Sequence, residues 1–225
     1  MFNRRSFLAF VVLLASGELA LAQQQPPPPT GTVPPPSGTV PPPATGGRRG
    51  GGGGRGGTAV MTLSTSAWAD GGQIPARYSQ AGAEVSPPLA WSGAPQGTAS
   101  FVLIAHDADA AANTIEGQLL WMVWNIPATA TGLAEAFPQG DRQPDGTRQI
   151  SQTGPNYRGP SAPASGPVHH YMFELFALDT VLTVEPRTTP PNGGIVSEAR
   201  TALLAAITGH VRGKAILFGL YRKPE

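Results

Sequence analysis

Apolar residues gather in short runs from about Ala59 onward, with Gly-, Pro- and Asn-rich stretches between them. Runs of this length bounded by turn-forming residues predict strands. The predicted strands are Val60–Leu63, Val85–Trp91, Ala99–Ala105, Leu119–Ile126, Tyr171–Leu178 and Ala215–Tyr221. The Tyr171–Leu178 run is apolar on both alternating faces except at Glu174, which predicts a strand covered on both sides. Pro87 and Pro88 make the second strand an edge or an irregular strand.

A helix is predicted late in the chain. Ser197 is a candidate N-cap, and Leu203, Leu204 and Ile207 form an apolar stripe at helical spacing. Gly209 stands where a C-terminal glycine is expected. Many strands with one late helix predict a mainly β fold, a sandwich or barrel with a peripheral C-terminal helix.

Residues 1–22 have the pattern of a cleaved export signal, with Arg4 and Arg5 ahead of a short apolar run and cleavage after Ala22. The run is well short of the ~20 residues that span a bilayer, so no stable membrane span is expected. The arginine pair before Phe7-Leu8 favours twin-arginine export, with an ordinary secretory signal as the alternative. Either route predicts a periplasmic or secreted bacterial protein.

Residues 23–57 are predicted to be a disordered linker, because they contain too few large apolar side chains to offset the entropy of ordering. Two Gly-Thr-Val-Pro-Pro-Pro units favour a semi-rigid polyproline II spacer, followed by a flexible glycine run. Docking of the proline segment into an aromatic groove is the alternative. Residues 58–225 then form a single folded domain.

Charge and composition remove several function classes. The net charge of +1 gives no field that favours nucleic acid. The absence of cysteine excludes disulfides, zinc–thiolate sites, a thiol nucleophile and a cysteine-linked lipid anchor. No H-E-x-x-H or G-x-S-x-G motif is present, and no cofactor is predicted.

Three segments that carry polar chemistry flank predicted strands. His106-Asp107-Ala108-Asp109 follows one strand, and His169-His170-Tyr171 begins another. Tyr157-Arg158-Gly159-Pro160 lies in the long span 138–167, which has little apolar periodicity. If the strands are neighbours, two carboxylates, up to three imidazoles and a phenol converge at one end.

These segments, in this order and spacing, resemble the bacterial branch of the phosphatidylethanolamine-binding protein family, also called Raf kinase inhibitor-like proteins. The resemblance runs from about Leu63 to Arg222. The matching stretches are Ser66–Tyr78, Ser86–Trp91, His106–Ala110, Trp124–Ala128, Gly159-Pro160, His169–Tyr171 and Ala177–Asp179. The resemblance implies a β-sandwich with a small pocket at one end that accepts phosphate-like groups, including phospholipid head groups.

Carried over by position, the resemblance implies that Asp107 and His169 line this pocket. Tyr157 and Tyr221 are further candidates, and Gly159 is a candidate backbone N–H donor. Leu120, before Trp121, stands where the family has a histidine, so one imidazole donor is missing.

Two further departures concern the supporting residues. His170 replaces an arginine, which makes any ion pair with Asp109 sensitive to pH. Ala108 and Ala111 replace prolines, so the loop loses rigidity. We therefore expect a retained pocket with a weakened or altered ligand preference.

Three functions remain open at this point. The first is a non-catalytic binding protein for a small anion or lipid head group. The second is a metal-dependent enzyme built from His106, Asp107, Asp109, His169 and His170. The third is an inhibitor or scaffold acting on a protein partner. The sequence leaves the oligomeric state open.

Overall fold

The computed structural model describes residues 57–110, 117–186 and 193–225, and of residues 193–197 only the backbone. The predicted signal peptide (1–22), all of the predicted linker except Gly57, and Ala111 lie outside the described residues.

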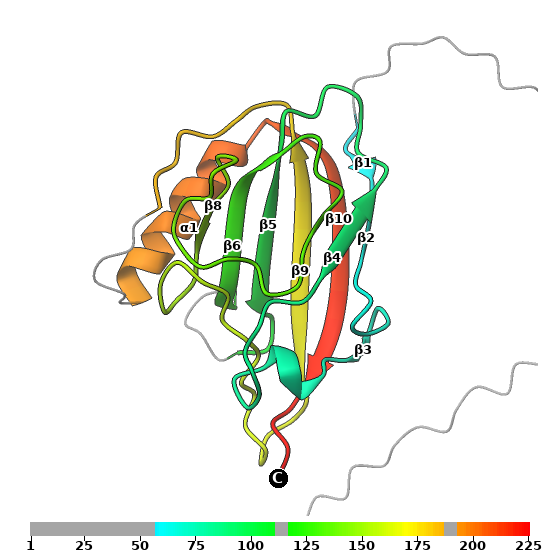
Figure 1. Ribbon diagram of the computed structural model, residues 1–225, viewed down its shortest axis with the longest axis vertical. Helices are drawn as coiled ribbons and strands as arrows, with labels where there is room; N and C mark the ends of the chain where they lie inside the picture. The colour runs from blue at the N-terminus through cyan, green and yellow to red at the C-terminus, as the bar shows by residue number, and fades with distance from the viewer. Residues whose placement is uncertain (1–56, 111–116, 187–192) are drawn as a thin grey trace, which may run out of the picture. The chain divides into compact units, whose positions relative to one another are not determined.

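The larger sheet contains seven strands among the described residues, in the order β1-β10-β9-β5-β6-β8, with β3 also pairing with β10 (Figure 1). Their bounds are β1 Ala59–Val60, β3 Gly72–Gln73, β5 Ser100–Asp107, β6 Gln118–Pro127, β8 Arg148–Ile150, β9 His169–Leu178 and β10 Val211–Tyr221. Strands β5, β6, β8, β9 and β10 pair antiparallel, whereas β1 and β3 run parallel to β10.

A smaller antiparallel sheet, in the order β2-β4-β7, and a helix complete the described fold. Their bounds are β2 Thr62–Ser64, β4 Leu89–Ser92, β7 Gly132–Leu133 and α1 Gly193–Ile207, with a 3₁₀ turn η1 at Ala76–Tyr78. None of the described helices combines the length and the apolar character needed to cross a bilayer.

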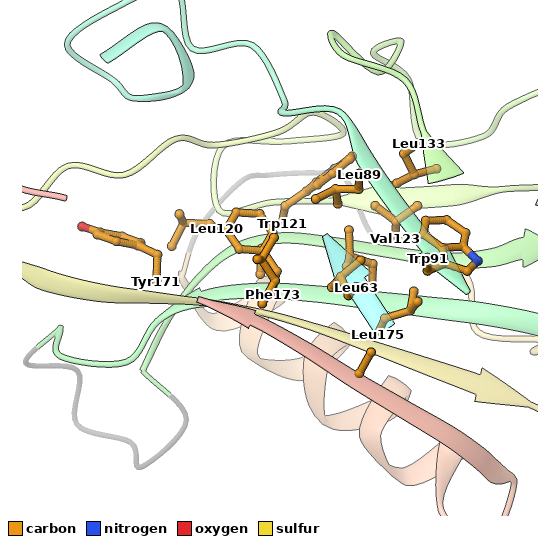
Figure 2. Close-up of a cluster of buried hydrophobic side chains, with 14 of the residues drawn as sticks. Leu63, Leu89, Trp91, Leu120, Trp121, Val123, Leu133, Tyr171, Phe173 and Leu175 are labelled. Carbon is orange, nitrogen blue, oxygen red and sulfur yellow. The ribbon is translucent and has the colours of Figure 1, made fainter. Parts of the chain in front are cut away.

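The two faces of the larger sheet pack against different layers. Leu63 and Trp91 of the smaller sheet join Phe173 in one buried cluster, so we call that side the inner face (Figure 2). Leu203 and Ile207 of α1 join Ile104 in a second cluster on the outer face. The mainly β sandwich with a peripheral helix is therefore confirmed, and β9 is covered on both faces as its apolar alternation predicted.

Several predicted boundaries were wrong. The helix begins at Gly193, so Ser197 lies within it and is not its N-cap. β10 begins at Val211, four residues early, because Arg212 and Lys214 point away from the core and concealed the alternation. β4 begins only at Leu89, after the Pro87-Pro88 pair that cannot donate ladder hydrogen bonds.

Candidate functional site

Four side chains meet at one end of the inner face, and we call them the end cluster: Asp107, His169, Tyr171 and Tyr221. Asp107 of β5 lies opposite Tyr171 of β9, and His169 of β9 lies opposite Tyr221 of β10. Residues directly opposite each other in antiparallel strands share a face of the sheet. In Figure 2 Tyr171 stands at one end of the apolar core, with its hydroxyl directed away from the other labelled side chains.

Asp107 and His169 are hydrogen-bonded and nearly buried. His169 Nδ1 lies 2.8 Å from Asp107 Oδ2 and 3.0 Å from Oδ1. Because the carboxylate only accepts, Nδ1 carries the shared proton, and Nε2 is the nitrogen left to face a ligand. Asp107 Oδ1 also accepts the N–H groups of Asp109 at 3.0 Å and Ala110 at 2.9 Å. One carboxylate therefore orients the imidazole and fixes the turn after β5.

Tyr171 and Tyr221 form the aromatic wall of the end cluster. The Tyr171 ring stacks on His169, with centroids 6.4 Å apart, and meets Tyr221 edge-on. Tyr171 Oη accepts the N–H groups of Ser161 and Ala162 at 3.3 and 3.1 Å. Burial, aided by the nearby Asp107 carboxylate, raises the pKa of Tyr171 well above its usual range, so the phenol stays neutral.

Sequence reasoning missed Tyr171 as a site residue. The signal was its two-residue spacing from His169 on a predicted strand, because alternate residues of a strand share a face.

A small hollow adjoins the end cluster at Tyr221. Its volume is about 260 Å³, and its lining is Gln80, Ala81, Pro160, Ser161, Tyr221 and Lys223. Tyr221 Oη lies 2.8 Å from buried Ser79 Oγ, which fixes the ring. The hollow is smaller than most pockets for drug-sized ligands, so it suits a small polar group.

Tyr157 holds the fold together next to the site. Its hydroxyl donates to Tyr78 O at 2.9 Å, and its ring packs edge-on against Trp121 with centroids 5.5 Å apart. Burial raises the pKa of Tyr157 far above its usual range, with a further contribution from the Glu84 carboxylate. The structure thus uses this predicted pocket residue to fasten the long span to η1.

Position 159 requires glycine, because the backbone of another segment approaches it closely. A Cβ atom at this position would lie 2.5 Å from Tyr78 O, which no real side chain tolerates. Its N–H, predicted to face a ligand, instead donates to Glu84 Oε1 at 3.2 Å.

Leu120 and Trp121 belong to the apolar core. Both are buried in the inner-face cluster, and Figure 2 shows Leu120 between Tyr171 and Trp121 in the view. The Trp121 indole N–H donates to Gln149 Oε1 at 2.8 Å, which marks this ring as a core residue and not a stacking platform. The position without its imidazole therefore adds an apolar side chain to the buried cluster that also contains Tyr171.

The remaining histidines of the predicted cluster lie on the outer face. His170 Nδ1 lies 2.7 Å from Asp109 Oδ2, and His106 Nε2 lies 3.4 Å from Glu174 Oε2. The predicted convergence of three imidazoles was wrong, because strand alternation divides them between the two faces. Within the described residues, no three His, Asp or Glu side chains are grouped as metal ligands.

Glu174 is the most strongly perturbed carboxyl on the outer face. The hydrogen bond from His106 and the Lys214 ammonium, 2.8 Å from Oε1, lower the pKa of Glu174 to about 2. Asp109 accepts the His170 N–H at 2.6 Å, and chiefly for this reason its pKa is lowered. The predicted contact between Asp109 and His170 is therefore present.

Comparison with known proteins identifies a family for this fold and site. The model of the family "Phosphatidylethanolamine-binding protein" matches residues 64–222. A UPF0098 protein of Methanothermobacter thermautotrophicus is 42% identical over 165 residues, which cover 72% of this chain and 99% of that protein. A Mycobacterium tuberculosis protein named "Putative lipoprotein LppC" is 32% identical over 154 residues, covering 68% of this chain and 69% of its own.

A solved structure agrees with these sequence relationships. The crystal structure of Escherichia coli YbcL, titled a new member of the mammalian PEBP family, has a TM-score of 0.56 and 25% identity. The similarity covers 73% of this chain and 99% of YbcL.

Proposed function

Because the chain belongs to the phosphatidylethanolamine-binding protein family, we propose that it is an exported, non-catalytic binding protein for a small anion. The ligand class is inorganic phosphate or a phospholipid head group, held at the end cluster and the adjoining hollow. The observation that carries this proposal is the nearly buried Asp107–His169 pair packed against the aromatic wall of Tyr171 and Tyr221.

The Asp107–His169 pair can offer an anion a charged hydrogen-bond donor. Asp107 accepts from Nδ1 of His169, so a second proton on the imidazole is placed at Nε2. An imidazolium N–H directed at an oxyanion forms a charge-assisted hydrogen bond, which neutral imidazole as an acceptor does not offer. Lys223 at the hollow adds a second cation.

Leu120 weakens the site in this proposal. A charge-assisted hydrogen bond to an anion contributes roughly 1.5–3 kcal/mol, so one missing imidazole costs about one to two decades in affinity. The apolar side chain of Leu120 favours a ligand with a small organic part over bare phosphate.

The test is an NMR titration of the protein with inorganic phosphate and, separately, with phosphoethanolamine. We expect amide shifts near Asp107 and His169 that disappear in His169→Gln. The matched control is His210→Gln, because His210 forms a similar 2.8 Å contact with Asp179 on the surface. A folded wild-type protein with no shift at either residue up to high millimolar ligand would exclude the binding proposal.

Export is the second part of the proposal. It is supported by the predicted signal at residues 1–22 and by similarity to a protein named as a lipoprotein. This chain has no cysteine for a lipid anchor, so release after Ala22 is expected. Fractionation of an expressing bacterium should give a periplasmic or secreted chain beginning at Gln23. Replacing Arg4 and Arg5 by lysine should block twin-arginine export and leave general secretion intact.

A further inference from the structure

α1 covers only part of the outer face of the larger sheet. It packs on β5 and β6, and Figure 1 shows it beside β6 and β8, away from β10. On the other part, four apolar side chains of β9 and β10 belong to neither buried cluster and to none of the partly buried groups packed against the clusters: Met172, Ile216, Phe218 and Leu220. Within the described residues, this part of the outer face therefore has an apolar surface without a covering layer.

This surface continues to the edge strand β1. Met172 lies opposite Phe218 across the two strands, and Ile216 shares the outer face two residues earlier on β10. Val60 of β1 pairs with Lys214 and therefore lies on the same face. Val60 and Ile216 are exposed, and with Lys214 they line part of a hollow of about 500 Å³. We call the four apolar side chains and Val60 the β10 patch; a contiguous apolar surface is typical of a site that binds a protein or a membrane.

The charges beside the β10 patch are sorted by strand. Glu174 of β9 lies 2.8 Å from Lys214 of β10. Asp179, directly after β9, forms an ion pair with Arg212 of β10. The acidic residues therefore follow one strand, and the basic residues follow its neighbour.

This order of charges makes the surface complementary to a second copy of itself. A two-fold axis parallel to the strands, between β9 and β10, places β9 of each copy against β10 of the other. Glu174 then approaches Lys214 of the second copy, because Lys214 lies opposite Phe176, the next outer-face residue after Glu174 on β9. An ammonium has three N–H donors, so each lysine can bind both carboxylates. We propose that the β10 patch binds a second copy of this chain in a two-fold symmetric dimer.

A second copy fits this surface better than a lipid bilayer does. The negative charges of Glu174 and Asp179 oppose an anionic lipid surface, whereas the second copy offers them lysine and arginine. Burial of the apolar side chains supplies most of the binding free energy, and the ion pairs set the orientation of the two copies. The end cluster lies on the inner face, so the dimer does not depend on the proposed function.

The first test determines the mass of the purified protein by sedimentation over a series of concentrations. The wild-type protein should reach the mass of two chains. Ile216→Asp places a charge within the β10 patch and should weaken the dimer at least about tenfold, because the carboxylate would be buried without a partner. Val181→Asp is the matched control, since Val181 is another exposed valine-sized position outside β9 and β10, and it should leave the dimer unchanged.

A second test exchanges the charges across the two-fold axis. Glu174→Lys places two lysines at each contact between the copies, and Lys214→Glu places two glutamates there. Each variant alone should therefore keep the mass of one chain. An equal mixture of the two variants restores opposite charges at both contacts and should form a heterodimer with the mass of two chains.

Three outcomes overturn the proposal. The first is a folded wild-type protein that keeps the mass of one chain up to high micromolar concentration; if it then binds vesicles of neutral phospholipid through Ile216, the patch belongs to a membrane contact instead. The second is equal dimer formation by Ile216→Asp and Val181→Asp. The third is a mixture of the two folded charge variants that forms no heterodimer. If either charge variant fails to fold, the comparison of Ile216→Asp with Val181→Asp decides.

Discussion

The inner and outer faces of the larger sheet carry the same chemistry in different surroundings. His169 and His170 are neighbours on β9, and each pairs with an aspartate from the end of β5, at 2.8 Å for Asp107 and 2.7 Å for Asp109. On the inner face the Asp107 side chain is 5% exposed, whereas on the outer face that of Asp109 is 42% exposed. Strand alternation places the two histidines on opposite faces, and Asp109 reaches the outer one from the turn after β5.

The contrast teaches that contact distance does not determine what a pair contributes. Exposed ion pairs stabilise a protein by about 0–1 kcal/mol, because water screens the attraction. Removing one partner of a buried pair costs about 3–5 kcal/mol, since the remaining group is left without compensation. The inner pair should therefore dominate stability, although the two pairs have nearly the same contact distance.

The largest effect is expected for Asp107→Ala. The substitution leaves His169 without its acceptor and removes the oxygen that binds the Asp109 and Ala110 N–H groups. We expect the free energy of unfolding to fall by about 3–5 kcal/mol, measured by urea unfolding at neutral pH. A loss below about 1 kcal/mol would mean that the inner pair behaves like a surface pair.

The next effect concerns acid stability and the half-buried Glu174 on the outer face. Its folded pKa is about 2, below the reference value of 4.5, so its stabilisation is complete above 4.5 and lost as pH falls toward 2. By linkage the wild-type protein should lose up to about 3 kcal/mol over this range through Glu174. Urea unfolding at several acidic pH values should show that the free energy of unfolding of Glu174→Gln falls less steeply with decreasing pH than that of the wild-type protein. The control Glu135→Gln, at an exposed position, should keep most of the pH dependence that the wild-type free energy of unfolding shows.

A smaller effect is expected on ligand affinity. Leu120→His adds an imidazole to the inner face next to Tyr171 and should tighten phosphate binding about tenfold, measured by NMR titration. The buried imidazole should also lower stability. Leu119→His is the matched control, because Leu119 is buried in the outer-face cluster. An equal gain in both variants would show that the added imidazole acts through charge alone.

The smallest effect is expected for Asp109→Ala. The loss of stability at neutral pH should stay below about 1 kcal/mol, because the pair with His170 is exposed. The His170 N–H lowers the pKa of Asp109, so this small contribution is present above the reference value of 3.8 and is lost as pH falls below it. Urea unfolding that showed a loss comparable with Asp107→Ala would remove the distinction between the two faces.

The long core strands and part of the site could be predicted from the sequence. β5, β6 and β9 are dense in bulky apolar residues, so local composition alone marked them. Asp107 and His169 were expected together because each lies at a strand end, and the structure places them in contact. These features depend on local pattern and on the family resemblance.

Other features depend on tertiary contacts that local pattern does not encode. β8 has only three residues inside the long span and is defined by its pairing with β6. Gly159 and Tyr157 were predicted for the pocket, but close approach to η1 determines both. Glu84 gave no signal, because nothing in its neighbourhood along the chain indicates a contact with Gly159, 75 residues away.

The short strand β1 determines how mechanical load enters the folded domain. It has two residues, pairs with β10 alone among the strands that the structure describes, and leaves the Val60 residue 93% exposed. A pulling force applied before Gly57 therefore acts first on the contacts that Ala59, Val60 and the Met61 N–H make with β10. Because β1 buries so little apolar surface, it separates before the core strands do. We therefore expect the end cluster to keep its geometry while β1 separates, because β1 pairs with Gly213 and Lys214 and not with the Tyr221 end of β10.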